Sequence, residues 1–401
     1  MTKLNEAYIV SPVRTPIGKF GGSLRPLTAN DLMVRIVNEL IARTGLDGAT
    51  VDEVIVSQSY ASSEAPCLGR YGALAAGLPI GVPGYTLDRR CGSGLQAVIN
   101  AAMCVQTGQA DAVMVVGVES MSNIEYYTTD MRWGARAGSV TLHDRLESGR
   151  VKAQPEERFG YISGMPETAD TLACEYGVSR EEADAFAAMS HARAHAAWES
   201  GRFDDEICSV EVPGRKGMSI TVSQDEGIRP ESTPESLAGL RSLREGGVCT
   251  AGNSSQQNDA AAGCLVVSGD YLAKHGLTPM GRLVGWSVAG VDPARMGIGP
   301  VPATRKLLER TGLTLDQMDL IELNEAFASQ ALAVLKALEL NNLERVNVNG
   351  SGISLGHPIG ATGVRILTTM LHEMKRRKSR FGLETMCIGG GQGIAAVFER
   401  P

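Results

Sequence analysis

The sequence predicts an α/β protein made of two similar halves, with a helical segment inserted between them. Apolar, β-rich runs alternate with helical patterns along most of the 401-residue chain, which is typical of layered α/β folds whose sheets are buried on both faces. A glycine-flanked strand-to-helix unit occurs twice. The middle of the chain, from about residue 122 to 247, is richer in charge and poorer in strand signals.

The expected strands are short apolar runs that end at glycines or polar residues. The first opens the chain at "EAYIVSPVRTPIG", residues 6–18, and the others lie in the runs 53–57, 110–120, 263–269, 281–290, 318–327 and 385–399, the last of which has a glycine turn after Cys387. Between the strands, apolar residues follow helical spacing, as at Leu95, Val98, Ile99 and Ala102.

The inserted segment is expected to be mainly helical. Its clearest pattern is "SREEADAFAAMSHARAHAAWESG", residues 179–201. Ser179 precedes the periodic residues and Glu182 stands three positions later, which is typical of a capping box at a helix start.

Two units along the chain share one plan. Cys91 is followed by glycines, a helix and a strand, and His357 is followed by Gly360, Gly363, a helix and a strand. Duplication of one α/β unit would place Cys91 and His357 at equivalent helix starts, where a pseudo-twofold axis brings them to one cleft. The expected halves are residues 1–120 with 251–280, and residues 281–401; the inserted domain is residues 121–250.

Composition and charge narrow the class of protein. Hydrophobic residues make up 43% and charged residues 21%, the balance of a soluble globular protein. No apolar run is long enough to span a membrane, and we expect no signal or transit peptide. The net charge of −7 argues against nucleic-acid binding. Eight scattered cysteines without a CxxC pair argue against a disulfide framework or a zinc site and favour the reducing cytoplasm.

Cys91 and His357 are the candidate nucleophile and base. Cys91, in "RRCGSG", is expected at the first turn of a helix, where free N–H groups, the helix dipole and two arginines favour the thiolate. His357 lies in the glycine-rich "LGHPIGATG", with Pro358 expected at a first helical position. A buried structural thiol and a packing or capping histidine are the alternatives.

Two further segments carry candidate residues after apolar strands. Asn324 and Glu325, in "LNEAFA", form a polar pair at an expected helix start, where they can hold a water or cap a backbone. Cys387, in "CIGGGQG", precedes a glycine turn whose N–H groups can form an anion nest or an oxyanion hole. Strand packing is the alternative for Cys387, and the turn matches neither common phosphate-loop pattern.

The chain resembles the thiolase family from its first strand to its last. The resemblance lies in six segments that follow the family's order: "CGSGLQA", "TAGNSSQQNDAAAG", "GVDPARMGIGPVPA", "LNEAFA", "NVNGSGISLGHPIGATG" and "CIGGGQGIAA". It implies the thiolase-type layered α-β-α-β-α fold of two duplicated halves. It also implies an acyltransferase that cleaves 3-ketoacyl-CoA with coenzyme A, or condenses acyl-CoA with acetyl-CoA in the reverse direction.

The resemblance also implies a role for each candidate catalytic residue. Cys91 would carry the acyl group as a thioester, and His357 would deprotonate it and form half of an oxyanion hole. A water held by Asn324 would complete that hole, and Cys387 would act as acid and base on the second substrate. The N–H groups of Cys91 and Gly389 would form the second oxyanion hole.

Contacts to coenzyme A follow from the resemblance alone. Coenzyme A would be substrate and product, with no permanently bound cofactor and no metal, and the inserted domain would cover it. The residues that match contact positions for coenzyme A or the acyl group are Met165, Arg229, Ala251, Ser255, Met296 and Phe327.

The motifs leave the acyl-chain preference open. "SGMPETAD", with Gly164 and Pro166, is similar to β-ketoadipyl-CoA thiolases, whereas "SGISLGHPIGATG" and "RWGARAG" are similar to broad-range bacterial β-ketothiolases. Gln256 and Leu243 depart from residues usual near the pantetheine and the adenine. We expect a medium or broad acyl range and a role in fatty-acid metabolism such as β-oxidation.

Two other functions are compatible with cysteines and glycine turns of this kind. A decarboxylating ketoacyl synthase typically pairs its cysteine with two histidines, whereas this chain has Asn324 and Cys387 in the corresponding places. A non-catalytic redox or binding protein would hold a nucleotide in its glycine turns and use its cysteines as sensors. A separate hypothesis is that oxidation joins Cys91 and Cys387 reversibly and silences the enzyme. The resemblance also implies a homodimer or homotetramer, without nucleic-acid or membrane partners.

Overall fold

The computed structural model describes residues 4–401 and places nearly all its strands in one large mixed sheet. The strand order is β4-β3-β5-β10-β1 followed by β11-β14-β13-β12, and β1 and β11 join the two parts as an antiparallel pair. A short strand, β2, pairs with β10. The bounds are β1 Ala7–Arg14, β2 Gly18–Lys19, β3 Glu53–Ser57, β4 Gly84–Leu87, β5 Ala112–Ser120, β10 Asn258–Ser268, β11 Pro279–Gly290, β12 Leu320–Leu323, β13 Phe381–Ile388 and β14 Gln392–Glu399.

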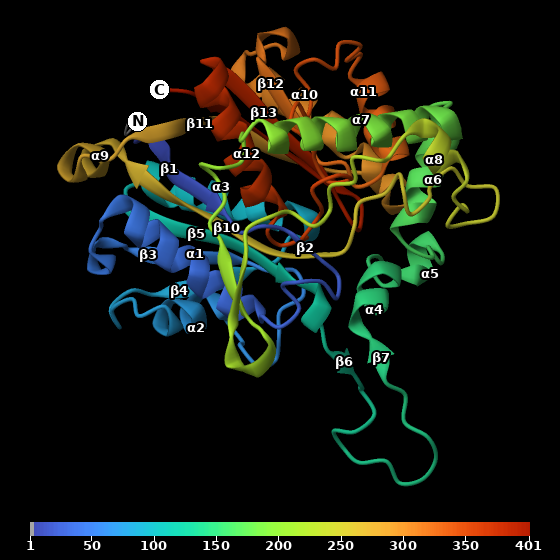
Figure 1. Cartoon of the computed structure of the whole chain (residues 1–401), viewed down its shortest axis with the longest axis horizontal. Coiled ribbons are helices and arrows are strands. Elements are labelled where there is room, and N and C mark those ends of the chain that lie inside the picture. The colour runs from blue at the N-terminus through green and yellow to red at the C-terminus, as the bar shows by residue number, and fades with distance from the viewer. Residues whose placement is uncertain (1–3) are drawn as a thin grey trace.

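The two parts of the sheet repeat one topology. From β1 outward, two antiparallel pairings lead through β10 to β5, and parallel pairings follow to β3 and β4. From β11 outward, two antiparallel pairings lead through β14 to β13, and parallel pairing follows to β12. A parallel bridge between Ile321 and Val346 stands where β4 stands in the first half. In Figure 1 the first half is blue to teal, except for β10 between yellow and orange, and the second half is orange to red.

Helices cover both faces of each half. The central pair, α3 (Ser93–Gln106) and α12 (Thr362–Arg377), packs into one apolar core with strands of both halves. The outer helices α1 (Ala29–Thr44) and α2 (Leu68–Ala75) cover the first half, and α10 (Pro300–Thr311) and α11 (Ala328–Ala337) cover the second. The short α9 (Gly269–His275) connects the halves. The layered α/β fold expected from the sequence is therefore confirmed.

A long insertion separates β5 from β10, whereas a tight turn connects their counterparts, β13 and β14. It contains the helices α4 (Arg145–Val151), α5 (Glu156–Phe159), α6 (Met165–Glu175), α7 (Arg180–Glu199) and α8 (Pro234–Ala238), and the hairpins β6–β7 (Tyr126–Tyr127 and His143–Asp144) and β8–β9 (Val210–Pro213 and Ser219–Val222). The capping box expected at Ser179 and Glu182 is present at the start of α7. The domain boundaries drawn from the sequence stay a prediction.

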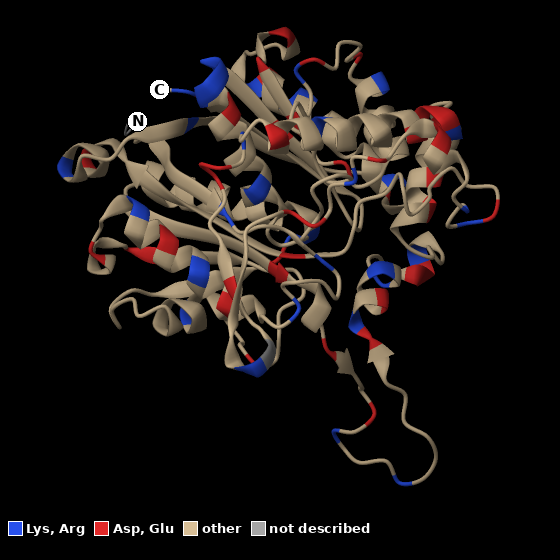
Figure 2. Ribbon diagram, viewed as in Figure 1, with Lys and Arg blue, Asp and Glu red and all other residues tan. Residues whose placement is uncertain are grey.

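The insertion gives the molecule its outline. The green helices α4, α5 and α6 run along one side, α7 crosses the upper part of the view, and the loop between β6 and β7 extends away from the body (Figure 1). Most charged residues lie on outer helices and loops, while the strands of the large sheet are mainly uncharged (Figure 2). Within residues 4–401, no helix combines the length and the apolar composition needed to cross a bilayer.

One expectation about local structure is confirmed and one was wrong. The glycine turn expected after Cys387 is present: the run 385–399 contains the end of β13 and all of β14, which fold back at Gly390 and Gly391. These residues have φ of +87° and +89°, which glycine alone adopts without steric cost. The helix expected at Pro358 begins only at Thr362, because residues 352–361 form successive turns before it.

Candidate active site

One cavity brings together most of the residues that the sequence singled out. It measures about 250 Å³, and Cys91, His357, Cys387 and Gly389 all line it. These four come from the turn before α3, the turns before α12, and the end of β13 with its following turn. The remaining lining residues are Ser59, Tyr60, Arg90, Met121, Gly149, Arg150, Met165, Pro166, Leu243, Ser254, Ser255, Gln256, Gln257, Met296, Ala326, Phe327 and Ile359.

Cys91 sits on a sharp turn between β4 and α3. The preceding residue, Arg90, has φ +47°, which is uncommon for a residue with a side chain. Hydrogen bonds hold the turn: the N–H of Arg90 donates to Asp88 Oδ1 at 2.6 Å, and Ser59 Oγ donates to the Arg90 carbonyl at 3.1 Å. Backbone strain of this kind is retained where the surrounding structure over-determines it, often at functional sites.

Two glycines allow the helix that follows Cys91 to cross α12 with backbone touching backbone. A methyl group on Gly363 would lie 2.1 Å from the Leu95 nitrogen, and one on Gly94 would lie 2.7 Å from the Val364 nitrogen. Neither position has room for any side chain. This crossing is what brings the turn of Cys91 and the turn of His357 into one cavity.

The hydrogen bonds of His357 define which ring nitrogen is free. The Thr362 hydroxyl donates to the Pro358 carbonyl at 2.9 Å, so its oxygen accepts from the Nδ1–H of His357 at 2.7 Å. The Nε2 atom then carries a lone pair, and it is buried without a hydrogen-bond partner among residues 4–401. Burial, with the Arg365 guanidinium, lowers the pKa of His357 to about 3, so the ring is neutral near pH 7.

The thiolate preference expected for Cys91 was wrong for the resting site. Burial raises the pKa of the Cys91 thiol above its usual value. The N–H of Gly389, the Arg90 guanidinium and the N–H of Cys91 itself oppose this rise without cancelling it. A thiol beside a neutral imidazole therefore has to pass its proton to that imidazole when it attacks.

Cys387 and Gly389 face the same sulfur from the end of β13. Burial raises the pKa of the Cys387 thiol far above its usual value, and the Cys91 sulfur adds to the rise. Cys387 is thus a thiol that holds its proton until a strongly basic carbanion or enolate accepts it. The N–H groups of Gly389 and Cys91 both point to the Cys91 sulfur, the geometry of a two-donor oxyanion hole.

Asn324 lies beside the imidazole but does not line the cavity. Its Nδ2 is 3.5 Å from His357 Nδ1, and its Oδ1 is buried without a partner in the described part of the chain. This free amide oxygen can accept a hydrogen bond from a water molecule held beside the imidazole. The Glu325 carboxylate, in contrast, accepts hydrogen bonds from Ser190 Oγ at 2.6 Å and from Asn347 Nδ2 at 2.8 Å.

A buried carboxylate ties the turn that carries His357 to the loop that follows β3. Glu119, at the end of β5, accepts hydrogen bonds from the N–H groups of Ser59, Tyr60 and Gly360 at 3.0, 3.2 and 2.9 Å. Burial raises the pKa of Glu119 to about 7, against the effect of these donors. No sequence motif indicated Glu119, because it lies in an apolar strand whose pattern predicts only a buried core strand.

The residues expected to contact coenzyme A divide into two groups. Met165, Ser255, Met296 and Phe327 line the cavity. Arg229 and Ala251 do not: the N–H of Arg229 donates to His191 Nδ1, and Ala251 is exposed. Tyr60, Met121 and Arg150 were missed by sequence reasoning, since they come from separate segments without a motif. Ile359 was also missed, although it lies inside "LGHPIGATG", two residues after His357.

Among residues 4–401, no group of three or more histidine, cysteine or acidic side chains is placed to hold a metal ion. A thiol, an unprotonated imidazole and paired N–H donors aimed at one sulfur define an acyl-transferring cysteine enzyme.

Comparisons with known proteins place the chain within that class. Family models described as "Thiolase, N-terminal domain" and "Thiolase, C-terminal domain" match residues 7–270 and 277–400. The chain therefore belongs to the thiolase family, and the thiolase fold expected from its motifs is confirmed.

Similar proteins cover the whole chain. An acetyl-CoA acetyltransferase of Pseudomonas aeruginosa is 45% identical over 99% of this chain and 100% of its own length. The β-ketothiolase BktB of Cupriavidus necator is 46% identical over 98% and 99%. The crystal structure of a Bacillus anthracis acetyl-CoA acetyltransferase, 43% identical, superposes with a TM-score of 0.95 over 100% of both chains.

Proposed function

We propose that this thiolase cleaves 3-ketoacyl-CoA with coenzyme A, and runs the reverse Claisen condensation, through an acyl group carried on Cys91. The observation that carries the proposal is the free Nε2 of His357 in the same cavity as the Cys91 thiol, with two N–H groups directed at the sulfur. A human mitochondrial 3-ketoacyl-CoA thiolase solved in complex with CoA superposes with a TM-score of 0.92 at 39% identity, over 100% of this chain and 99% of its own.

In the first half-reaction His357 Nε2 takes the proton of Cys91, and the thiolate attacks the 3-keto carbon of the substrate. The N–H groups of Cys91 and Gly389 stabilise the negative oxygen that forms. The bond between C2 and C3 then breaks, and its electron pair passes to C2 as the enolate of acetyl-CoA. Cys387 donates its proton to C2, which leaves acetyl-CoA and an acylated Cys91.

In the second half-reaction the thiol of coenzyme A gives its proton to the Cys387 thiolate and attacks the acyl carbon. The same oxyanion hole serves this step. The Cys91 thiolate leaves and recovers its proton from His357, so each group returns to its starting state. The protonated Nε2 and a water held by Asn324 support the enolate oxygen while it exists.

Turnover of acetoacetyl-CoA and coenzyme A to acetyl-CoA tests the proposal. We expect turnover in the wild type, with a Cys91→Ala variant reduced to background while it keeps the wild-type thermal unfolding midpoint. Unchanged turnover in Cys91→Ala would rule out the covalent route. A ketoacyl synthase would instead require a malonyl-type donor and would leave acetoacetyl-CoA intact.

The acyl range stays a proposal of medium or broad chain length. The relatives are named for different acyl groups, including acetyl-CoA acetyltransferases and an Escherichia coli 3-oxoadipyl-CoA/3-oxo-5,6-dehydrosuberyl-CoA thiolase that is 43% identical over 99% of this chain and 100% of its own length. Coenzyme A and acyl-CoA are the proposed partners. We place the enzyme in the cytoplasm and in fatty-acid metabolism, including β-oxidation.

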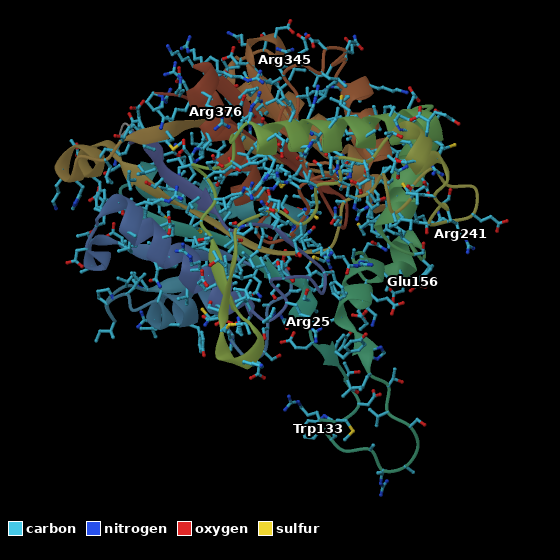
Figure 3. All side chains as sticks on the ribbon, in the orientation of Figure 1. Arg25, Trp133, Glu156, Arg241, Arg345 and Arg376 are labelled. Atoms are coloured by element: carbon cyan, nitrogen blue, oxygen red, sulfur yellow. The ribbon has the colours of Figure 1, made fainter. Side chains whose placement is uncertain are left out.

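Assembly from several copies, as a homodimer or homotetramer, is also proposed. The support is the loop between β6 and β7, which extends from the body and carries large apolar side chains (Figure 3). Trp133, at 94% exposure, and Leu142, at 67%, are more exposed than such side chains usually are in an isolated soluble protein. Contact with another copy would cover them.

A further inference from the structure

The catalytic cavity contains two arginines and no acidic residue. Arg90 and Arg150 line it, and none of the other lining residues is aspartate or glutamate. The single histidine is neutral, so it does not change this balance. The proposed reaction assigns no step to Arg150 and none to the guanidinium of Arg90.

Packing of α4 against Tyr60 brings Arg150 to the side of the cavity where Arg90 lies. A methyl group on Gly149 would lie 2.7 Å from the Tyr60 ring, so only glycine allows α4 to come this close. The Gly149 carbonyl accepts a hydrogen bond from Arg90 at 2.7 Å, and Arg150 follows it directly. Both guanidinium groups act to lower the pKa of the Tyr60 hydroxyl, against burial, which raises it. They therefore lie on the same side of the cavity.

Neither guanidinium is neutralised by the protein. No ion pair among residues 4–401 involves Arg90 or Arg150, whereas Arg145 on the same helix pairs with Glu125 at 3.3 Å. In the described part of the chain, the Arg90 side chain has one hydrogen-bond acceptor, the Gly149 carbonyl. Two like charges in a half-closed, partly apolar space repel each other, and an anion between them would relieve that repulsion.

The nucleophile does not explain the pair. A Cys91 thiolate exists only until the acyl group is attached, and Arg150 is not among the groups that perturb the Cys91 pKa. The phosphates of coenzyme A are separated from its thiol by the length of the pantetheine arm. When that thiol reaches Cys91, the phosphates lie well beyond Arg90, the residue adjacent to Cys91.

Apolar side chains lie on the same side as the arginines. Tyr60, Met121 and Ile359 pack with Leu146 of α4, and the first three also line the cavity. A second apolar group, with Met165, Met296 and Phe327, lies near Cys387. An acyl chain that runs from Cys91 towards α4 would thus pass methylene-binding side chains and then meet two guanidinium groups.

We propose that Arg90 and Arg150 form a carboxylate subsite, which directs this enzyme to 3-ketoacyl-CoA substrates whose acyl chain ends in a carboxylate. The inference rests on the proposed thiolase function and specifies its substrate class. Arginine is suited to the role, because its planar guanidinium binds a carboxylate through two parallel hydrogen bonds.

The test compares acyl groups of equal carbon number with and without the terminal charge. We expect kcat/KM for 3-oxoadipyl-CoA or 3-oxosuberyl-CoA to exceed that for 3-oxohexanoyl-CoA or 3-oxooctanoyl-CoA by about tenfold or more, the usual effect of a charged hydrogen-bonded pair. Arg150→Gln and Arg90→Gln should each lower this ratio by a similar factor, and Arg150→Lys should retain part of it. Arg158→Gln, an exposed arginine on α5 outside the cavity, is the matched control and should keep the ratio.

Several results would overturn the subsite. One is a wild-type ratio near one for both chain lengths, and another is a ratio that neither glutamine variant changes. A rise in the KM for coenzyme A by the same factor with every acyl substrate would assign the arginines to the coenzyme phosphates instead. Acetoacetyl-CoA separates the two hypotheses: turnover without preference for a carboxylate refutes only the subsite, while no turnover of any substrate refutes the thiolase function.

Discussion

Replacing Gly363 by alanine should impair catalysis strongly. The added methyl group would lie 2.1 Å from the Leu95 nitrogen and 2.8 Å from the Gly94 carbonyl carbon, which are backbone atoms that cannot rotate away. Ordinary contact begins at 3.4 Å, so the helices α3 and α12 must separate by about 1.3 Å along this line.

That separation moves the turn of Cys91 away from the turn of His357. A misplacement of about 1 Å between reacting groups can cost about a hundredfold in rate, so we expect kcat for acetoacetyl-CoA thiolysis to fall by at least that factor. Overpacking should also lower the free energy of unfolding by about 1–3 kcal/mol.

The assay pairs steady-state turnover with urea unfolding. Gly94→Ala needs a smaller displacement, about 0.7 Å from the Val364 nitrogen, and should lose less activity. Gly81→Ala is the matched control, because a methyl group there meets nothing within 4 Å. Wild-type turnover in Gly363→Ala would show that the glycine crossing does not set the catalytic geometry.

Four other predictions concern the groups around the site and the assembly. Thr362→Val should lower kcat by about tenfold and shift the pH profile of kcat, because Nδ1 of His357 loses the acceptor that fixes the ring's tautomer. Thr362→Ser should restore the rate and the profile. An unchanged profile in Thr362→Val would argue that Thr362 does not fix the tautomer. Burial lowers the pKa of His357 to about 3 and raises the pKa of the Cys91 thiol. The value of kcat/KM should therefore stay level from pH 6 to 8 and fall only below about pH 5, as the imidazole takes up a proton. A fall on the acid side with its midpoint near pH 6.5 would contradict the buried, neutral imidazole. Glu119→Ala should lower the free energy of unfolding by about 3 kcal/mol, because three buried N–H groups lose their acceptor, while Glu119→Gln should lower it less. Equal stability of the two variants in urea unfolding would show that these hydrogen bonds do not stabilise the fold. Trp133→Ser should weaken self-association, measured by light scattering across a dilution series, and an oligomer of unchanged size and affinity would place the interface elsewhere.

Strand and helix alternation could be predicted because buried strands and amphipathic helices leave local, periodic patterns. The run 53–57 matches β3, and the capping box at Ser179 marks the start of α7. The glycine turn after Cys387 could be predicted because consecutive glycines interrupt an apolar run, and it is the fold-back at Gly390 between β13 and β14. The late start of α12 was missed because Pro358 fits a helix start as well as a turn.

Within the candidate site, the residues in glycine-rich motifs could be predicted from the sequence. The burial of these residues and the side chains packed around them could not. Cys91, His357 and Cys387 stand out beside glycines, and the structure brings them to one cavity. The raised pKa of the Cys91 thiol depends on burial by residues distant in sequence, which outweighs the local donors. The place of Arg150 in the cavity could not be predicted, because it depends on the packing of α4 against Tyr60, a contact between segments about ninety residues apart.

The most direct measurement is the site of acylation. The protein is mixed with acetyl-CoA in the absence of a second acceptor, quenched in acid, digested and analysed by peptide mass spectrometry. The proposed chemistry requires one acetyl group on the peptide that contains Cys91, removed again when coenzyme A is added before the quench. An unmodified Cys91, or an acetyl group found on Cys387 instead, would contradict the central claim.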